Sequence, residues 1–281
     1  MNRRPSFPAK LTPAGSAATP RRKTDANTGA SLPGLAGPIA SPAKSSNGMR
    51  AALASNASRP LPVSTGLGLD SSAVRARMVN KLAEQGVKDP WVLNAMGRVE
   101  RHRFVESALA NQAYEDTSLP IGLGQTISKP NVVARMIELL RQDATGHLGR
   151  VLEIGTGCGY QAAVLSHLAT EVYSIERLRG LHEKAKNNLL PFRLPNVHLI
   201  LGDGMLGFPK GAPYAGIISA AGGDAVPQAW LDQLAVGGRL VAPTITPAGH
   251  QALVVILRTE AGFDRQVLEA VHFVPLKSGI A

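Results

Sequence analysis

One stretch of the chain combines closely spaced glycines with acidic residues, which is the chemistry needed to hold a nucleotide. Residues 151–160 read Val-Leu-Glu-Ile-Gly-Thr-Gly-Cys-Gly-Tyr, and Glu176 follows Gly155 by 21 positions. Glycines in a turn between a strand and a helix let the backbone approach a ligand, and a later acid accepts hydrogen bonds from a ribose. A dinucleotide site of the form G-x-G-x-x-G would need glycine at position 160, where this chain has Tyr160. The spacing therefore indicates a nucleotide site of another kind.

The E-x-G-x-G-x-G pattern of this stretch resembles the S-adenosylmethionine (AdoMet) site of class I methyltransferases. The resemblance implies that AdoMet is the co-substrate and that its site includes Glu153, Gly155, Thr156, Gly157, Gly159 and Glu176. Glu176 would take the ribose hydroxyls, although an acid at a helix start is also favoured by the helix dipole. Glu153 would either face the methionine amino group or brace the glycine turn, and the sequence does not choose between these roles.

The elements that must position these residues alternate between strand and helix from Arg150 onward. We expect strands at 151–155, 171–176, 197–201, 215–219 and 238–243, and helices at 159–169, 178–190 and 227–235. Strands in this rhythm pair in parallel with right-handed connections. Two further strands, 252–258 and 267–274, form a hairpin-like ending. We predict an α/β fold, a doubly wound, mostly parallel seven-stranded sheet of the Rossmann-like class I methyltransferase type, with an antiparallel C-terminal hairpin.

An N-terminal helical cap is expected before the first strand of the sheet. Asp70-Ser-Ser72 can cap one helix, and Asp89-Pro90 starts a second. Residues 113–130 show no clear period and are rich in Gly, Thr, Ser and Pro, which indicates a long ordered loop or a pair of short strands. A third helix follows from Pro130 to about Leu140.

The first 69 residues differ in composition from the rest of the chain. They hold nine of the 20 prolines and a net charge of +8, whereas residues 70–281 have a net charge of +2. Such a composition cannot bury enough surface to offset chain entropy, so we expect a disordered basic leader at 1–69. It would be a solubilising tail, with an anion-binding or nucleic-acid contact or an organelle transit peptide as alternatives. The methyltransferase domain would then span 70–281, with the cap and active-site loop at 70–149 and the core at 150–281.

Motifs outside the glycine turn narrow the resemblance to one family. In chain order they are Phe104-Val105, Ala113-Tyr-Glu-Asp116, Leu119-Pro-Ile-Gly-Leu-Gly-Gln-Thr-Ile-Ser-Lys-Pro130, Gly202-Asp-Gly204, Pro227-Gln-Ala-Trp-Leu231, Leu234-x-x-Gly-Gly-Arg-Leu-Val241 and Phe273-Val-Pro-Leu276. With residues 151–160 they resemble the protein-L-isoaspartate O-methyltransferase family over roughly residues 72–281. The Gly-Gln-Thr-Ile-Ser segment upstream of the glycine turn is the most specific of these motifs.

The resemblance implies methyl transfer from AdoMet to the free carboxylate of L-isoaspartyl residues, and of D-aspartyl residues, in damaged proteins. The methyl ester then closes to a succinimide, which begins repair. A carboxylate with a pKa near 4 is already an anion at neutral pH, so no general base is required. The site must hold one oxygen in line with the methyl group. Because charge is lost in the transition state, hydroxyls and backbone N–H groups suit this task better than Arg or Lys.

By resemblance, Ser128 is the catalytic residue, and its hydroxyl would orient the substrate carboxylate. A helix cap for the following helix is the alternative, and the two roles are compatible. Thr126 and Ile127 would line the same loop and contact AdoMet or the peptide backbone, and the loop can move as a lid. Asp203 would face the adenine amino group with Gly204 giving clearance, and a plain Asp-Gly turn is the alternative.

Four places depart from the family pattern without removing a group that the chemistry needs. Lys129 beside Ser128 would attract the anionic substrate or simply point to solvent. Cys158 stands where serine is common, and we interpret it as a small buried residue because no partner histidine is suggested. Ala215-Gly216 begins the fourth expected strand and Gly222-Gly223 follows it. The sequence does not decide which AdoMet contacts form there.

Cysteine content and hydropathy argue against disulfide-bonded, metal-binding, membrane-spanning and secreted proteins. One cysteine rules out an intrachain disulfide, and the seven histidines show no metal-ligand spacing, so no metal is expected. The sequence has no run of about 18 apolar residues and no secretory signal core. We expect a cytoplasmic monomer that acts on isoaspartyl-containing proteins and peptides, with no membrane and no specific nucleic-acid partner.

Three other functions compete with this interpretation. A nicotinamide-dependent dehydrogenase is disfavoured by Tyr160 and by the C-terminal hairpin. A nucleic-acid or small-carboxylate AdoMet methyltransferase that uses the basic leader is the main alternative. Amino-methylating relatives carry an Asn/Asp-Pro-Pro-aromatic motif after the fourth strand, whereas residues 219–223 read Ser-Ala-Ala-Gly-Gly. A non-catalytic binding module is disfavoured by the intact Ser128, Glu176 and Asp203.

Overall fold

The computed structural model describes residues 72–281, and the predictions for the leader at 1–69 and for Asp70 and Ser71 lie outside them. No helix within the described range has the length and apolar character needed to cross a membrane.

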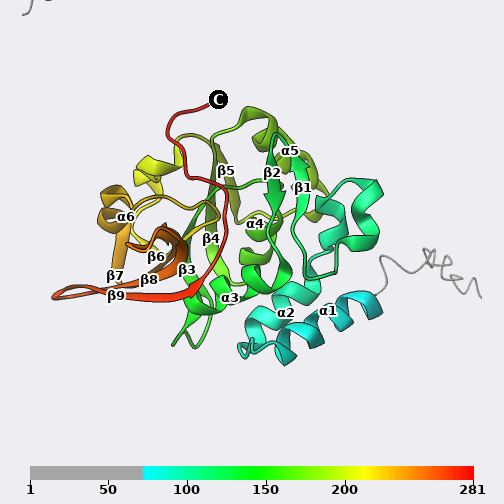
Figure 1. Ribbon diagram of the computed structural model, residues 1–281, viewed down its shortest axis with the longest axis horizontal. Helices are drawn as coiled ribbons and strands as arrows, with labels where there is room; N and C mark the ends of the chain where they lie inside the picture. The colour runs from blue at the N-terminus through cyan, green and yellow to red at the C-terminus, as the bar shows by residue number, and fades with distance from the viewer. Residues whose placement is uncertain (1–71) are drawn as a thin grey trace, which may run out of the picture. The chain divides into compact units, whose positions relative to one another are not determined.

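A seven-stranded sheet forms the centre of the described part, in the order β5-β4-β3-β6-β7-β8-β9 (Figure 1). Five strands pair in parallel, namely β3 (Leu148–Ile154), β4 (Ala169–Glu176), β5 (Val197–Leu201), β6 (Tyr214–Ser219) and β7 (Leu234–Ile245). The last two, β8 (Gln251–Thr259) and β9 (Gly262–Ala270), extend the sheet in antiparallel fashion. This arrangement confirms the predicted fold class.

The strand order reverses between β3 and β6. The chain first adds β4 and β5 on one side of β3 and then returns to place β6 on the other side. In open α/β sheets, ligands bind outside the carboxyl ends of the strands at such a switch point. The topology therefore predicts where the site lies before any side chain is considered.

Apolar side chains cover both faces of the sheet. One face carries Val151 and packs with α3 (Pro130–Arg141), α4 (Tyr160–Leu165) and α5 (Arg179–Leu189). The other face carries Leu152 and packs with Trp230 of α6 (Gln228–Gln233). Neighbouring residues of one strand point to opposite faces, so two apolar cores require strands that are apolar throughout.

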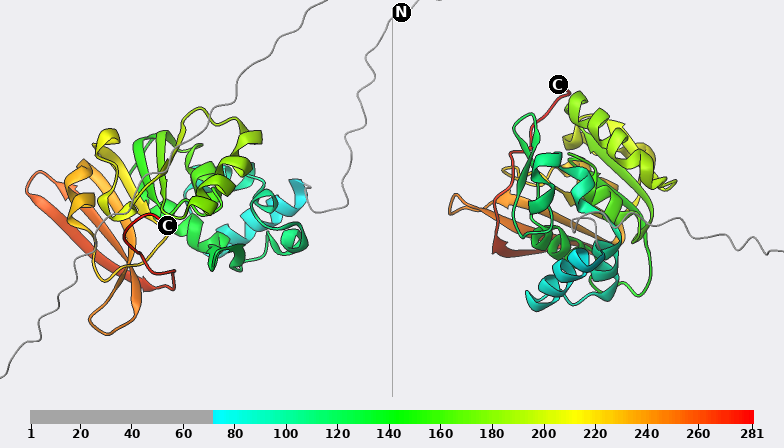
Figure 2. Two further views of the ribbon diagram at one scale, coloured as in Figure 1. Left: turned by 90° about the horizontal axis from the view of Figure 1, so that it is seen from above. Right: turned by 90° about the vertical axis from the view of Figure 1, so that its right-hand side faces the viewer.

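The helical cap consists of α1 (Ser72–Glu84) and α2 (Pro90–Arg98). Asp89 caps α2, because its side chain accepts hydrogen bonds from the backbone N–H groups of Trp91 and Val92. Figure 2 shows this cap in cyan on one side of the described part and the β8–β9 hairpin in orange on the opposite side.

A two-stranded hairpin lies within residues 113–130, for which we expect a long ordered loop or a pair of short strands. It pairs β1 (Leu119–Gly122) with β2 (Gln125–Ile127). The three residues at its tip, Gly122, Leu123 and Gly124, have φ values of 96°, 52° and 69°. A leucine in this left-handed region is strained, so the tip is held in a conformation that a free chain would avoid.

The expected boundaries were wrong at several places, and the strand expected at 238–243 spans Leu234–Ile245. The last strand spans 262–270 rather than 267–274, because a tight turn pairs Gly262 directly with Thr259 and the strand begins there. The helix expected at 159–169 ends at Leu165, and the one expected at 227–235 ends at Gln233. In both cases the next strand begins inside the range expected for the helix, because β4 begins at Ala169 and β7 begins at Leu234.

Candidate active site

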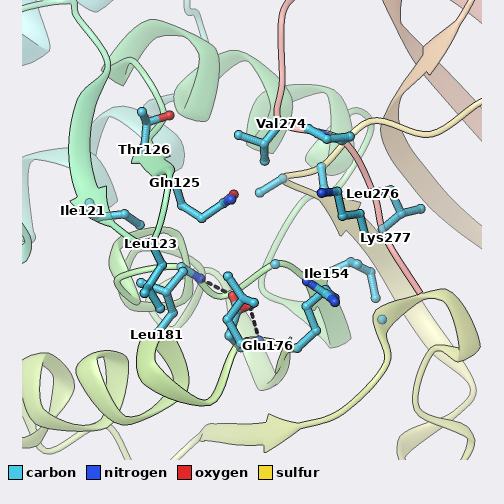
Figure 3. Close-up of a pocket in the computed structure, with 18 of the residues that line it drawn as sticks. Ile121, Leu123, Gln125, Thr126, Ile154, Glu176, Leu181, Val274, Leu276 and Lys277 are labelled. Atoms are coloured by element: carbon cyan, nitrogen blue, oxygen red, sulfur yellow. Dashed lines mark hydrogen bonds between the residues drawn. The ribbon is translucent and has the colours of Figure 1, made fainter. Parts of the chain in front are cut away.

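A cavity of about 480 Å³ lies at the carboxyl ends of β3, β4 and β6, at the switch point of the sheet. Figure 3 shows Glu176 at its floor, Ile121 and Leu123 of the hairpin on one side, and Val274 and Leu276 of the C-terminal tail on the other. The other lining residues are Gly124, Gln125, Thr126, Ser128, Ile154, Gly155, Gly157, Ile175, Arg177, Leu178, Leu181, Gly204, Ala220, Ala221, Pro275 and Lys277. This volume and mixed lining are typical of a small-molecule site.

The glycine turn brings bare backbone to the surface of this cavity. Gly155 and Gly157 line it with φ values of 89° and 57°, a region that glycine adopts without strain. The N–H groups of Gly155 and Thr156 donate to the carbonyl of Ile175 at 2.9 and 3.1 Å, which fixes the turn to β4. Gly159 lies outside the lining and occupies the N-cap position of α4.

Glu176 joins the glycine turn to the start of α5. Its side chain is buried, and Oε2 accepts from the Gly157 N–H while Oε1 accepts from the Leu178 N–H, both at 2.9 Å (Figure 3). Each carboxylate oxygen has a second lone pair, so Glu176 retains acceptor capacity for hydroxyl groups in the cavity. Its position fits the predicted contact with a ribose.

Glu153 is fully buried behind the glycine turn and does not line the cavity. Its Oε2 accepts from Ser174 Oγ at 2.5 Å, and Ser174 Oγ lies 2.6 Å from the hydroxyl of Thr156, which is also buried. Burial raises the pKa of Glu153 to about 8, and the Ser174 and Gln161 side chains oppose this shift. Of the two roles predicted for Glu153, this placement favours bracing the turn.

Asp203 lies outside the lining, whereas its neighbour Gly204 is part of it. Asp203 Oδ1 accepts from the N–H of Met205 at 2.9 Å, and Oδ2 accepts from the N–H of Gly279 at 2.7 Å. The first bond is the Asp-Gly turn of the alternative interpretation, and the second ties down the C-terminal tail. Glycine is needed at position 204, because a Cβ there would lie 2.6 Å from Ile154 Cγ2.

Ser128 lines the cavity at the end of the hairpin. Its carbonyl accepts a hydrogen bond of 2.7 Å from Arg101 Nη2. The N-cap position of α3 is occupied by Lys129, without a side-chain cap bond, and Asp116 Oδ1 instead accepts from the N–H of Asn131 at 2.9 Å. The structure thus assigns the capping role to Asp116 and leaves the Ser128 hydroxyl available to the cavity.

Four further residues that the sequence analysis discussed are Thr126, Ile127, Lys129 and Cys158. Thr126 lines the cavity, whereas Ile127 is buried in the apolar core and does not. Lys129 is exposed, as expected for a side chain that points to solvent. Cys158 is buried, and burial raises its pKa to about 11, so the thiol is not a nucleophile at neutral pH.

The C-terminal tail supplies lining residues that the sequence analysis did not assign. Val274 to Lys277 cross the cavity, held where the Gly222 N–H donates to the Val274 carbonyl at 2.8 Å and the Leu276 N–H to the Gly222 carbonyl at 2.7 Å. A Cβ at Gly222 would lie 2.5 Å from Nε2 of Gln251, a side chain that bonds to the backbone of Phe273. The Phe273-Val-Pro-Leu276 motif was the available signal, but we assigned its start to a strand.

Comparisons with known proteins agree with this geometry. A family model described as protein-L-isoaspartate(D-aspartate) O-methyltransferase matches residues 73–281. The chain is 61% identical to a protein-L-isoaspartate O-methyltransferase from Methylibium petroleiphilum, over 76% of this chain and 81% of the relative. It is 62% identical to one from Leptothrix cholodnii, over 76% and 77% of the two chains.

Solved structures support the same assignment. A protein-L-isoaspartate O-methyltransferase aligns with a TM-score of 0.66 and 29% identity, over 73% of this chain and 67% of the other. A Plasmodium falciparum protein described as a putative member, in complex with S-adenosyl-L-homocysteine, shares the fold at 23% identity, with a TM-score of 0.62 over 72% and 98% of the two chains. With the family model matching most of its length, the chain belongs to the protein-L-isoaspartate(D-aspartate) O-methyltransferase family.

Proposed function

We propose that this protein transfers the methyl group of AdoMet to the free carboxylate of L-isoaspartyl residues in damaged proteins and peptides. D-Aspartyl residues are a second acceptor, and the ester begins repair by closing to a succinimide. One observation carries the proposal: Ser128 lines the same cavity as Gly155, Gly157 and Glu176. A hydroxyl suited to orient an acceptor thus shares one space with a nucleotide-binding turn.

The cavity fits AdoMet. The backbone of Gly155 and Gly157 permits close approach, Glu176 can accept from ribose hydroxyls, and Ile154 and Ile175 provide apolar surface for a base. When bound, AdoMet supplies an electrophilic methyl group on a sulfonium centre.

The acceptor half of the reaction needs orientation rather than proton transfer. The isoaspartyl carboxylate is ionised at neutral pH, and no histidine occurs in the cavity lining within the described residues. Ser128 donates its hydroxyl hydrogen to one carboxylate oxygen, which leaves the other oxygen to attack the methyl group. A neutral donor suits a reaction that loses charge, because it stabilises the ionic ground state less than a salt bridge would.

We place the protein in the cytoplasm and expect it to act as a monomer on isoaspartyl-containing proteins and peptides. Light scattering of the purified full-length chain tests the second point, since a dimer would give twice the monomer mass.

The decisive experiment is methyl transfer from labelled AdoMet to a synthetic isoaspartyl peptide. The normal aspartyl peptide is the control for the acceptor, and Ser128→Ala is the control for the site. We expect base-labile label on the isoaspartyl peptide alone, and a loss of at least tenfold in kcat/KM for Ser128→Ala, which corresponds to about 1.4 kcal/mol. AdoMet binding without transfer to either peptide would contradict the proposal.

A further inference from the structure

Arg101 is a buried cation that bonds to the chain on both sides of the β1–β2 hairpin. Its Nε donates to the carbonyl of Ala113 and its Nη2 to the carbonyl of Ser128, both at 2.7 Å, and its side chain is fully buried. Ala113 precedes β1 and Ser128 follows β2, so one guanidinium closes the whole hairpin segment. Only the planar fork of an arginine can bond two carbonyls in this way from fixed positions.

The same guanidinium also packs on the residue that follows the glycine turn. Its central carbon lies 4.7 Å from the ring centroid of Tyr160, which directly follows Gly159 of the glycine turn. Arg101 therefore lies between the backbone of Ser128 and the first residue of α4.

Another fully buried arginine shows how differently such a group can be used. Arg141 also stacks over an aromatic ring, that of Trp91, but its Nε donates to the carboxylate of Asp89 at 2.9 Å. Each of the two arginines has one terminal nitrogen without a hydrogen-bond partner, but Arg101, unlike Arg141, forms no ion pair among the described residues. Burying a charge without a carboxylate partner is costly. Stability alone therefore gives a poor account of Arg101.

We propose that Arg101 is the positioning residue of the acceptor site. By bonding the carbonyls of Ala113 and Ser128, it sets the backbone from which the Ser128 hydroxyl reaches the substrate carboxylate. Its contact with Tyr160 keeps that hydroxyl in register with the glycine turn. The inference rests on the proposed function, because it assigns Arg101 an effect on transfer that is exerted through Ser128.

The test compares Arg101→Lys with Arg141→Lys in the full-length protein. Each variant keeps a positive charge but loses the guanidinium fork, and Arg141 ends α3, about 17 Å along the helix from Pro130 at its start. Both should lower the melting temperature. We expect Arg101→Lys to lower kcat on an isoaspartyl peptide at least tenfold while the Kd of S-adenosylhomocysteine (AdoHcy) changes less than threefold. For Arg141→Lys, kcat should stay within twofold of the wild type.

A double-mutant cycle with Ser128→Ala separates positioning from general stability. If Arg101 acts through the Ser128 hydroxyl, Arg101→Lys should cost less than twofold in kcat once that hydroxyl is gone. An equal cost in both backgrounds, or equal kcat for the two lysine variants, would overturn the inference. Failure of the wild type to methylate the peptide would instead remove the proposed function.

A wild-type crystal structure with AdoHcy and an isoaspartyl peptide provides a measurement that does not depend on the folding of any variant. The guanidinium should still bond both carbonyls, with the Ser128 hydroxyl on the acceptor carboxylate. A Ser128 carbonyl turned away from Arg101 in that complex would reject the inference.

Discussion

The two walls of the cavity are built in different ways. The inner wall consists of Gly155, Gly157 and Glu176 at the ends of parallel strands, where backbone bonds to β4 and a buried carboxylate fix every part. The outer wall consists of the hairpin at 119–127 and the tail at 274–277, neither of which belongs to the seven-stranded sheet.

Side-chain donors such as Arg101 and Lys184 bond to the hairpin segment, and backbone hydrogen bonds with Gly222 hold the tail. Lys184 Nζ donates to the carbonyl of Ile121 at 2.9 Å, and Arg177 Nε donates to the carbonyl of Gly279 at 2.9 Å. Elements held by few contacts open at low free-energy cost. A site that binds a nucleotide deeply must also let it enter, so one wall serves recognition and the other serves access. The difference predicts that inner-wall variants change affinity strongly, whereas outer-wall variants change exchange rates modestly.

The largest effect is expected for Glu176→Ala on the inner wall. The change leaves the N–H groups of Gly157 and Leu178 without their partner and removes the acceptor that we propose for the ribose. A hydrogen bond to a charged group contributes about 1.5–3 kcal/mol, so the loss of two ribose bonds should raise the Kd of AdoHcy at least about 100-fold. Titration calorimetry measures it, with Glu176→Gln as an isosteric control that keeps one acceptor and should lie between. A Kd within threefold of the wild type would show that the inner wall does not depend on this carboxylate.

The same contrast separates what the sequence could predict from what it could not. The glycine turn and the position of Glu176 follow from local patterns, because a parallel strand and its turn are specified within about 25 residues. The contact between Asp203 and Gly279 joins residues 76 positions apart, and no periodicity reports such a pairing. Val274 was predicted to end a strand because it is apolar, and Leu276 was named only as part of a motif, but both line the cavity.

Arg101 shows a related limit of the sequence. An arginine in a polar stretch is expected at the surface, and burial against the Ala113 and Ser128 carbonyls appears only when the hairpin closes. Local patterns thus predicted the inner wall, whereas for the outer wall the sequence named Thr126 and Ser128 but not the residues of the tail.

An intermediate effect concerns Glu153, the buried acid that braces the inner wall. Its pKa of about 8 in the folded protein lies above the ordinary value of 4.5, so between these values the folded protein holds a proton that the unfolded chain has lost. The free energy of unfolding should therefore fall as pH rises through this window, by about 1.4 kcal/mol per pH unit from this group. Below pH 4.5 and above pH 8 the contribution is constant.

Glu153→Gln tests this dependence by removing the titrating group. Urea unfolding of both proteins at pH 5.5, 6.5 and 7.5 should show the variant gaining stability relative to the wild type at each step, by roughly 1 kcal/mol per unit. A constant difference across the three pH values would mean that Glu153 does not keep its proton in the folded state.

The smallest effect is expected for Lys184→Met, which removes the bond from α5 to the hairpin carbonyl of Ile121 and the ion pair with Glu106. Methionine keeps the apolar stem, so the change isolates the ammonium group. Losing one partly exposed hydrogen bond costs about 0.7 kcal/mol, which corresponds to an increase of about threefold in the AdoHcy dissociation rate. Lys186→Met is the matched control, because Lys186 lies on the same helix and, within residues 72–281, pairs only with Glu183 at the surface. Stopped-flow release of AdoHcy should distinguish the two variants. If Lys184→Met changed the Kd as much as Glu176→Ala does, the hairpin would belong to the recognition surface, and the division between the two walls would be wrong.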